Sequence, residues 1–177
     1  MDITDAILHD HDEQRALFAV IEQIDPSDTE ALAAVWRRLR ILLEVHAAAE
    51  EEHFYPRLLA IGRGANDADS PEAETEDAID DHNKIRDAAE AAERHPVGSP
   101  EWFAAVDKAN LENSKHMAEE ERQALADFRR NASLEERHRL CVQFLTFTYR
   151  HLDGIRAEDK DARVYIREHG GDVRELD

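Results

Sequence analysis

Apolar residues recur at spacings of three and four along most of the chain, which is the period of one face of an α-helix. Five segments show this period. The helices expected from them span about 4–25, 27–61, 71–94, 100–130 and 133–153. We expect the last twenty or so residues, which are rich in charge, to be irregular.

Boundary signals support these ranges. Ser70-Pro71 and Ser99-Pro100 each place a capping residue before a proline at the first helical position. Capping boxes begin at Ser27 and Ser133, and Thr4 is the predicted cap of the first helix. Pro56 falls inside the second segment, where proline kinks a helix or ends it early.

Four long helices with short connections predict an all-α fold, an antiparallel up-down-up-down four-helix bundle. An additional C-terminal helix packs across it through Leu140, Phe144, Leu145 and Phe147. We assign residues 1–132 to the bundle and 133–177 to a C-terminal helix and tail on the same domain.

The apolar stripe is interrupted by polar residues near the middle of each long helix. Besides Gln14 and Asn113, the interruptions are His11, His46, Glu50, His82, His116 and Glu120. Each helix thus aims one histidine at the bundle axis, and two helices add a glutamate one turn later. Burying these groups without partners costs several kcal/mol each, so the pattern indicates a site that compensates them.

These residues belong to an internal repeat. His11 and His46 are 35 residues apart, His82 and His116 are 34 apart, and the two pairs are offset by 71 and 70 residues. The second halves of the two copies read His46-x-Ala48-x-Glu50-Glu51 and His116-x-Ala118-x-Glu120-Glu121. The chain is therefore interpreted as two helical hairpins related by an approximate two-fold axis.

Such a set of side chains suits a pair of metal ions. Imidazole nitrogens with carboxylate oxygens favour iron, manganese or zinc. A histidine and a glutamate four residues later lie on one helix face, so both can reach one ion. A carboxylate can also bridge two ions about 3.5 Å apart, which leaves open positions for solvent or oxygen. The remaining acids of the runs 50–52 and 119–121 are expected to be solvated.

Composition narrows the function further. The net charge of −19 argues against binding to nucleic acid or anionic membranes. Cys141 is the single cysteine, and neither a signal peptide nor a membrane-spanning segment is visible, so we expect a cytoplasmic protein. No hydrolytic or nucleophilic constellation is present, and the sequence leaves the oligomeric state open.

At these residues the sequence resembles the hemerythrin-like family, the HHE cation-binding domain. The resemblance covers about residues 5–130 and rests on the four histidines, the two glutamates and the run Phe54-Tyr55-Pro56. It implies an antiparallel four-helix bundle with two iron ions that an oxo, hydroxo or solvent group can bridge. It also implies binding of O2, peroxide or nitric oxide, in oxygen or redox sensing or detoxification.

One position departs from that family. Oxygen carriers of the family have a fifth histidine four residues from the one on the third helix, and this chain has Ala78 and Arg86 at those distances from His82. His53 continues the inward stripe of the second helix, so it is a candidate for an additional ligand or an outer partner.

Two alternatives stay open. A ferritin-like iron storage or oxidation site would use Glu50-x-x-His53 and Glu135-x-x-His138. A metal-free helical interaction module would use none of these residues as ligands.

Overall fold

The structure is a computed structural model that describes residues 1–66 and 70–170. Within this part of the chain all regular structure is helical, which confirms the predicted all-α class. The helices are α1 (Ile3–Gln23), α2 (Thr29–His53), α3 (Tyr55–Ile61), α4 (Pro71–Glu93), α5 (Pro100–Arg122), α6 (Ala124–Asn131), α7 (Leu134–Arg150) and α8 (Ala162–His169). The end of the loop predicted over 62–69 and the end of the tail lie outside the described residues.

Three of the predicted caps are confirmed, and two lie elsewhere. Ser70, Ser99 and Ser133 each accept a hydrogen bond from a backbone N–H in the first turn of the following helix. The cap of α1 is Asp2 instead of Thr4, and that of α2 is Asp28, one residue after the predicted Ser27. An aspartate caps a helix as well as serine or threonine does, so a neighbouring carboxylate takes the role.

The two long helices that carry a predicted ligand glutamate, α2 with Glu50 and α5 with Glu120, both end within one turn after it. The predicted effect of Pro56 is seen as the end of α2 and the start of α3 around Phe54. The prediction of one continuous helix over 100–130 is wrong, because α5 ends at Arg122 and α6 begins at Ala124. At this second break the side-chain amide of Asn66 donates to the Arg122 carbonyl. The carbonyl of the last residue of α5 thus has a partner outside the helix.

The tail contains a helix that the sequence reasoning missed. Residues 162–169 form α8, whose first turn is capped by Asp161. Ala162 and Tyr165 are buried, and the Tyr165 hydroxyl donates to the backbone carbonyl of Glu51. Tertiary packing thus accompanies helix formation in a segment whose composition alone is that of a solvated tail.

The core consists of two apolar clusters. The first includes Ile7, Phe54 and Ile79, and the second includes Phe18 and Ile85 together with both tryptophans. Helices α1 and α4 run from the first cluster to the second, and α2 and α5 run back. Each of the four long helices packs against two of the others: α1 contacts α2, α2 contacts α4, α4 contacts α5, and α5 contacts α1. On each of them the predicted histidine lies between the two clusters.

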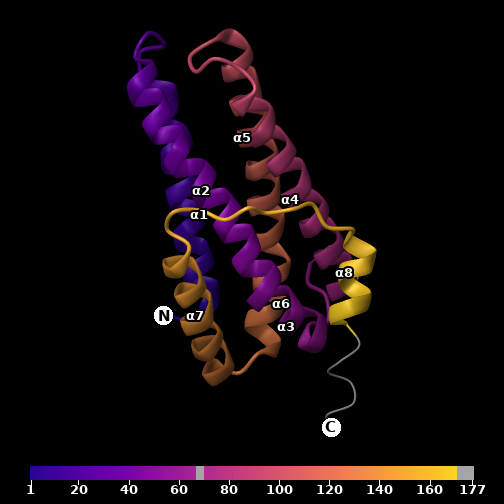
Figure 1. Cartoon of the computed structure of the whole chain (residues 1–177). Helices are drawn as coiled ribbons and strands as arrows, with labels where there is room; N and C mark the ends of the chain where they lie inside the picture. The colour runs from indigo at the N-terminus through magenta and orange to yellow at the C-terminus, as the bar shows by residue number, and fades with distance from the viewer. Residues whose placement is uncertain (67–69, 171–177) are drawn as a thin grey trace.

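The last two helices flank this core. Helix α7 packs on α1 and α2, and its Leu140 and Phe144 are buried in the first cluster. Helix α8 packs on α4 and α3. The segment between them crosses in front of α2 on its way to α8 (Figure 1).

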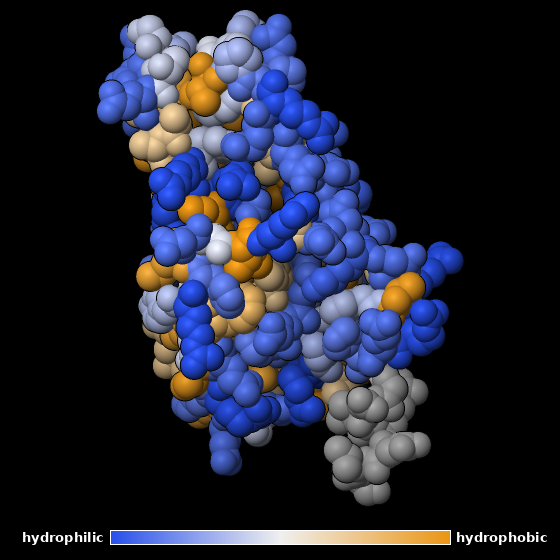
Figure 2. All heavy atoms as spheres, in the orientation of Figure 1, coloured by the Kyte–Doolittle hydropathy of each residue, from blue (hydrophilic) through white to orange (hydrophobic). Residues whose placement is uncertain are grey.

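The surface agrees with the acidic composition. Hydrophilic residues cover most of the face seen in Figure 2, with small hydrophobic patches between them. Among the described helices, none is long and apolar enough to cross a membrane.

Candidate metal centre

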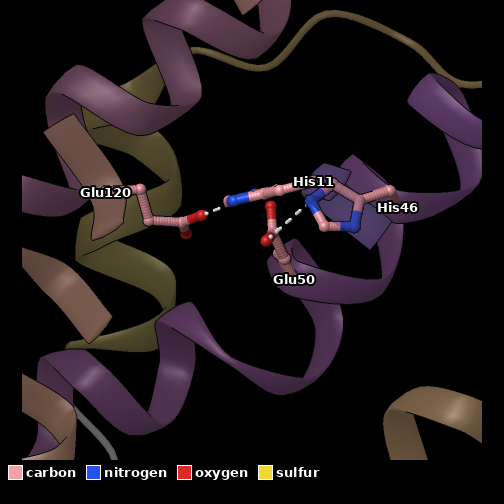
Figure 3. A group of neighbouring side chains, drawn as sticks. All are labelled: His11, His46, Glu50 and Glu120. Atoms are coloured by element: carbon pink, nitrogen blue, oxygen red, sulfur yellow. Dashed lines mark ion pairs between the residues drawn. The ribbon is translucent and has the colours of Figure 1, made fainter. Parts of the chain in front are cut away.

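The six predicted metal ligands meet between the two apolar clusters, and all six are buried. Two groups of ligand atoms each lie within 4.8 Å of one another. The first is His11, His46, Glu50 and Glu120, and the second is Glu50, His82 and His116. The residues come from all four long helices, and Figure 3 shows the first group. Folding therefore gathers groups that are as far apart as 109 positions in the sequence.

Glu50 belongs to both groups. Its Oε1 lies 3.0 Å from Nε2 of His46, and its Oε2 lies 3.3 Å from Nε2 of His82. The residue is fully buried, and neither oxygen has the geometry of a hydrogen bond to a partner. One carboxylate thus faces a histidine of each hairpin, which is the position of a bridging ligand.

Glu120 is less symmetric. Its Oε2 lies 3.3 Å from Nε2 of His11 and 4.0 Å from Nε2 of His116, while its Oε1 accepts a 2.6 Å hydrogen bond from the Tyr55 hydroxyl. Burial and the Glu120 carboxylate raise the pKa of Tyr55 well above its usual range, so the phenol stays a donor. Glu120 therefore has one oxygen available to a cation.

Three of the four histidines are oriented by carboxylates behind them. Nδ1 of His11 lies 2.9 Å from Glu121, and Nδ1 of His82 lies 2.9 Å from Glu51. Nδ1 of His46 lies 3.1 Å from Asp10. When Nδ1–H donates to a carboxylate, Nε2 is left as the ligand atom and its ring orientation is fixed.

His116 shows no such bond within the described part of the chain. The residue that the repeat places behind it, Asp81, instead accepts hydrogen bonds from Lys84 at 2.6 Å and Lys115 at 3.3 Å. Burial and the neighbouring His82 lower the pKa of His116 well below its usual range. His116 is therefore a neutral imidazole.

The electrostatics of the other residues follow from pairing. Burial by itself would lower the pKa of His82, but Glu50 and Glu51 more than offset burial and raise the pKa to about 9. At His46 burial also lowers the pKa, but the Glu50 and Asp10 carboxylates outweigh burial, and the pKa is raised well above its usual range. The pKa of Glu51 falls to about 2, because bonds from His82 and Lys160 outweigh its burial. The charges of these buried histidines and acids are thus stabilised by their close partners of opposite charge.

The donor set fits a cation. Buried atoms without a hydrogen bond include Nε2 of His11 and His46, both oxygens of Glu50 and Oε2 of Glu120. Nε2 of His82 and Nε2 of His116 face each other at 3.2 Å. Buried polar atoms are rarely left unpaired, and these converge on common points. Nitrogen and carboxylate oxygen without thiolate are ligands for iron, manganese or zinc.

Sequence reasoning missed the groups behind the ligands. Glu51, expected to be solvated, is buried and binds His82, and Glu121 binds His11. The signal was present, because a second glutamate follows the ligand glutamate in both copies of the repeat. No sequence signal pointed to the bond between Tyr55 and Glu120, since the second copy has no tyrosine at the matching position.

His53 joins neither group of ligand atoms. Its side chain is 18% exposed, and its ring packs on Phe147 of α7 with the ring centres 5.7 Å apart. Burial lowers its pKa. A role as an additional ligand or outer partner stays a prediction. In the ferritin-like alternative, Glu135 and His138 are exposed on α7, where they contribute nothing to a buried centre.

A helical fold with two clusters of buried histidine and glutamate is one that could hold metal ions. The family model described as the hemerythrin HHE cation binding domain matches residues 2–128, and the chain belongs to this family. Family members bind metal ions, typically iron.

The chain is also similar to a protein named DNA nickase from Nostoc sp. (strain PCC 7120). The two are 25% identical over 144 residues, which make up 81% of this chain and 38% of the relative. The chain thus spans well under half the length of that relative. No solved structure matches the chain.

Proposed function

We propose that this chain is a non-haem di-iron protein that binds O2 or a related small oxidant, peroxide or nitric oxide, in oxygen or redox sensing or detoxification. The observation that carries the proposal is the position of Glu50, whose two oxygens lie 3.0 and 3.3 Å from histidines of the two hairpins. A carboxylate placed in this way could serve as a ligand to two ions.

The residues have distinct roles in this proposal. One iron would be held by His11 and His46, and the other by His82 and His116, with Glu50 and Glu120 between them. When bound, the irons supply Lewis acidity and electrons to a small oxygen or nitrogen ligand. Glu51, Asp10 and Glu121 hold three of the imidazoles in the tautomer that leaves Nε2 free.

The available space favours a small ligand. A cavity bounded by His46, His82 and His116 offers about 20 Å³ of room for a water-sized molecule. One water needs about 10–15 Å³ of such room, so this volume suits a ligand of two or three atoms. Peroxide- or nitric oxide-processing activity is compatible with this size.

Three further statements belong to the proposal. The alternating directions of the four long helices support an antiparallel up-down-up-down four-helix bundle. We assign residues 1–132 to this bundle and 133–177 to its C-terminal extension. The cytoplasmic location predicted from the sequence is the third. DNA nicking and other binding to nucleic acid or membranes are not included, because the net charge of −19 opposes contact with polyanions.

The test is the metal content and absorption spectrum of the untagged protein. We expect close to two irons per chain and near-ultraviolet and visible bands of an oxo- or hydroxo-bridged ferric pair. Protein produced in iron-supplied cells that contains zinc alone, or no metal, would contradict the di-iron assignment.

A further inference from the structure

The small cavity beside the histidines has one polar wall and one apolar wall. We call Gln14 of α1 and Asn113 of α5 the polar wall, and Leu43 of α2 and Ile85 of α4 the apolar wall. The charged residues Glu44 and Arg86 also line the cavity. The repeat relates these residues in pairs, because Gln14 and Ile85 are separated by the offset of 71, and Leu43 and Asn113 by the offset of 70. Each polar residue of one wall therefore matches, through the repeat, an apolar residue of the other wall.

The polar wall is fully desolvated. Gln14 is 1% exposed and Asn113 is 2% exposed. The second core cluster next to them is built of apolar residues. Burying two amides in such surroundings costs free energy unless they form hydrogen bonds. Their presence beside the ligand histidines therefore calls for a partner.

Only part of this requirement is met within the protein. The Asn113 amide donates to Oε1 of Gln14 at 2.9 Å and to the sulfur of Met117 at 3.7 Å. The first of these bonds holds Oε1 of Gln14 toward Asn113. The amide nitrogen of Gln14 is buried and has no hydrogen-bond partner. An amide N–H donor, held by its own oxygen, is thus left over in a residue that lines the cavity.

An amide nitrogen that carries its protons is a donor and not a metal ligand. We propose that Gln14, held in position by Asn113, donates a hydrogen bond to the small ligand bound at the metal centre. Gln14 is then a specificity-determining residue, since it favours ligands that accept a hydrogen bond, peroxide and small anions, over an apolar diatomic. The inference rests on the proposed di-iron function and identifies the class of ligand that the site prefers.

The opposing residues agree with this assignment. Leu43 and Ile85 offer the ligand no polar atom. Arg86, four residues after His82, also lines the cavity. Its guanidinium is held by Asp159 at 2.7 Å and lies 3.8 Å from Glu51. Those carboxylates lie beside the two terminal nitrogens of Arg86, while its Nε is buried without a hydrogen-bond partner. The Gln14 amide and the Arg86 Nε are thus both unpaired donors in residues that line the cavity, and the Gln14 amide is the one oriented by a hydrogen bond to its own oxygen.

The experiment uses sodium azide as the probe with the iron-loaded, oxidised protein. Iron is counted first, and the azide dissociation constant is then read from the charge-transfer band. In Gln14→Leu we expect unchanged iron content and azide binding weaker by about tenfold or more, the loss typical of a hydrogen bond to a charged group. Asn113→Leu, which frees the Gln14 amide to turn, should weaken azide by a smaller factor.

Controls separate the inference from the proposed function. Ile85→Leu changes the opposite wall without a polar atom and should leave the azide dissociation constant within about twofold, as expected for an apolar swap. Metal-free Gln14→Leu should unfold at a lower temperature than the wild type, since the substitution also removes the oxygen that accepts the Asn113 hydrogen bond. Iron content is therefore counted in the folded variant before azide is added. Full iron with unchanged azide affinity in Gln14→Leu would overturn the inference, and so would loss of iron from that variant. A wild-type protein without iron would instead overturn the di-iron function.

Discussion

The two hairpins, α1 with α2 and α4 with α5, carry the same ligands but support them differently. In the first, Glu50 has both oxygens free of hydrogen bonds, whereas in the second Glu120 shares an oxygen with Tyr55. His46 is oriented by Asp10, whereas the matching Asp81 is bound by two lysines and leaves His116 without that support. An approximate symmetry in sequence is thus compatible with two unequal metal positions.

The outer acids differ as well. Glu51 is 3% exposed and is paired with Lys160 from the segment before α8, while Glu121 is 29% exposed and is paired with Arg15 at 2.6 Å. The C-terminal extension lies beyond the residues matched by the family model. The chain therefore adds its own support to the Glu51–His82 pair. The difference teaches that the candidate ligands are the same in both copies of the repeat, whereas the groups that pair with the outer acids differ.

The largest expected effect separates the two glutamates. In Glu50→Ala we expect loss of both irons, because each of its free oxygens faces a different histidine pair. Glu120→Ala should lose iron less completely, since one of its oxygens already belongs to Tyr55. Metal analysis per chain measures both, and Glu52→Ala, whose side chain is 60% exposed, is the control that keeps two irons. Two irons in Glu50→Ala would exclude the bridging role.

Metal removal is expected to destabilise the layer between the two core clusters. Ions bound only by the folded state add about 4 kcal/mol at a thousand-fold excess over their dissociation constant. For a chain of this size the stripped protein should therefore melt about 10 °C below the loaded form. Calorimetry of both forms checks this, and equal melting temperatures would be incompatible with a metal centre in the core.

The orienting acids provide the next test. Asp10→Ala should weaken metal affinity by about 10–100-fold, because Nδ1 of His46 loses its acceptor. Asp81→Ala should change affinity by less than about threefold, since Asp81 contacts lysines instead of His116. Competition with a calibrated chelator gives both constants. Equal losses in the two variants would show that the hairpins are supported alike in solution.

The smallest effects concern the outer ion pairs. Lys160→Met removes a partner of buried Glu51, and we expect a loss of about 1–2 kcal/mol in stability, reduced from the cost at a buried pair because Lys160 is 43% exposed. Arg15→Met removes the partner of the more exposed Glu121 and should cost less than about 1 kcal/mol. Urea unfolding of the two variants compares them. A larger loss in Arg15→Met would reverse the order proposed for the two sides.

Much of the site could be predicted because it is written as a repeat. The four histidines and two glutamates occur at matched spacings on helices with clear apolar stripes, and helical geometry converts those spacings into one layer. The helix over 162–169 and the break at Gln123 could not be predicted in this way. Both involve contacts between residues that are distant in the sequence, among them the Tyr165 hydroxyl with the Glu51 carbonyl and the Asn66 amide with the Arg122 carbonyl.

The sequence by itself determined the helical class, the depth of the six ligand candidates and the duplication of the hairpin, because these follow from local periodicity. Only the tertiary structure decided which carboxylate stands behind which histidine, that Tyr55 binds Glu120, and that Gln14 keeps an unpaired donor beside the cavity. The physical reason is range: periodicity acts over a turn or two, whereas hydrogen-bond pairing is settled by which side chains meet when the helices pack.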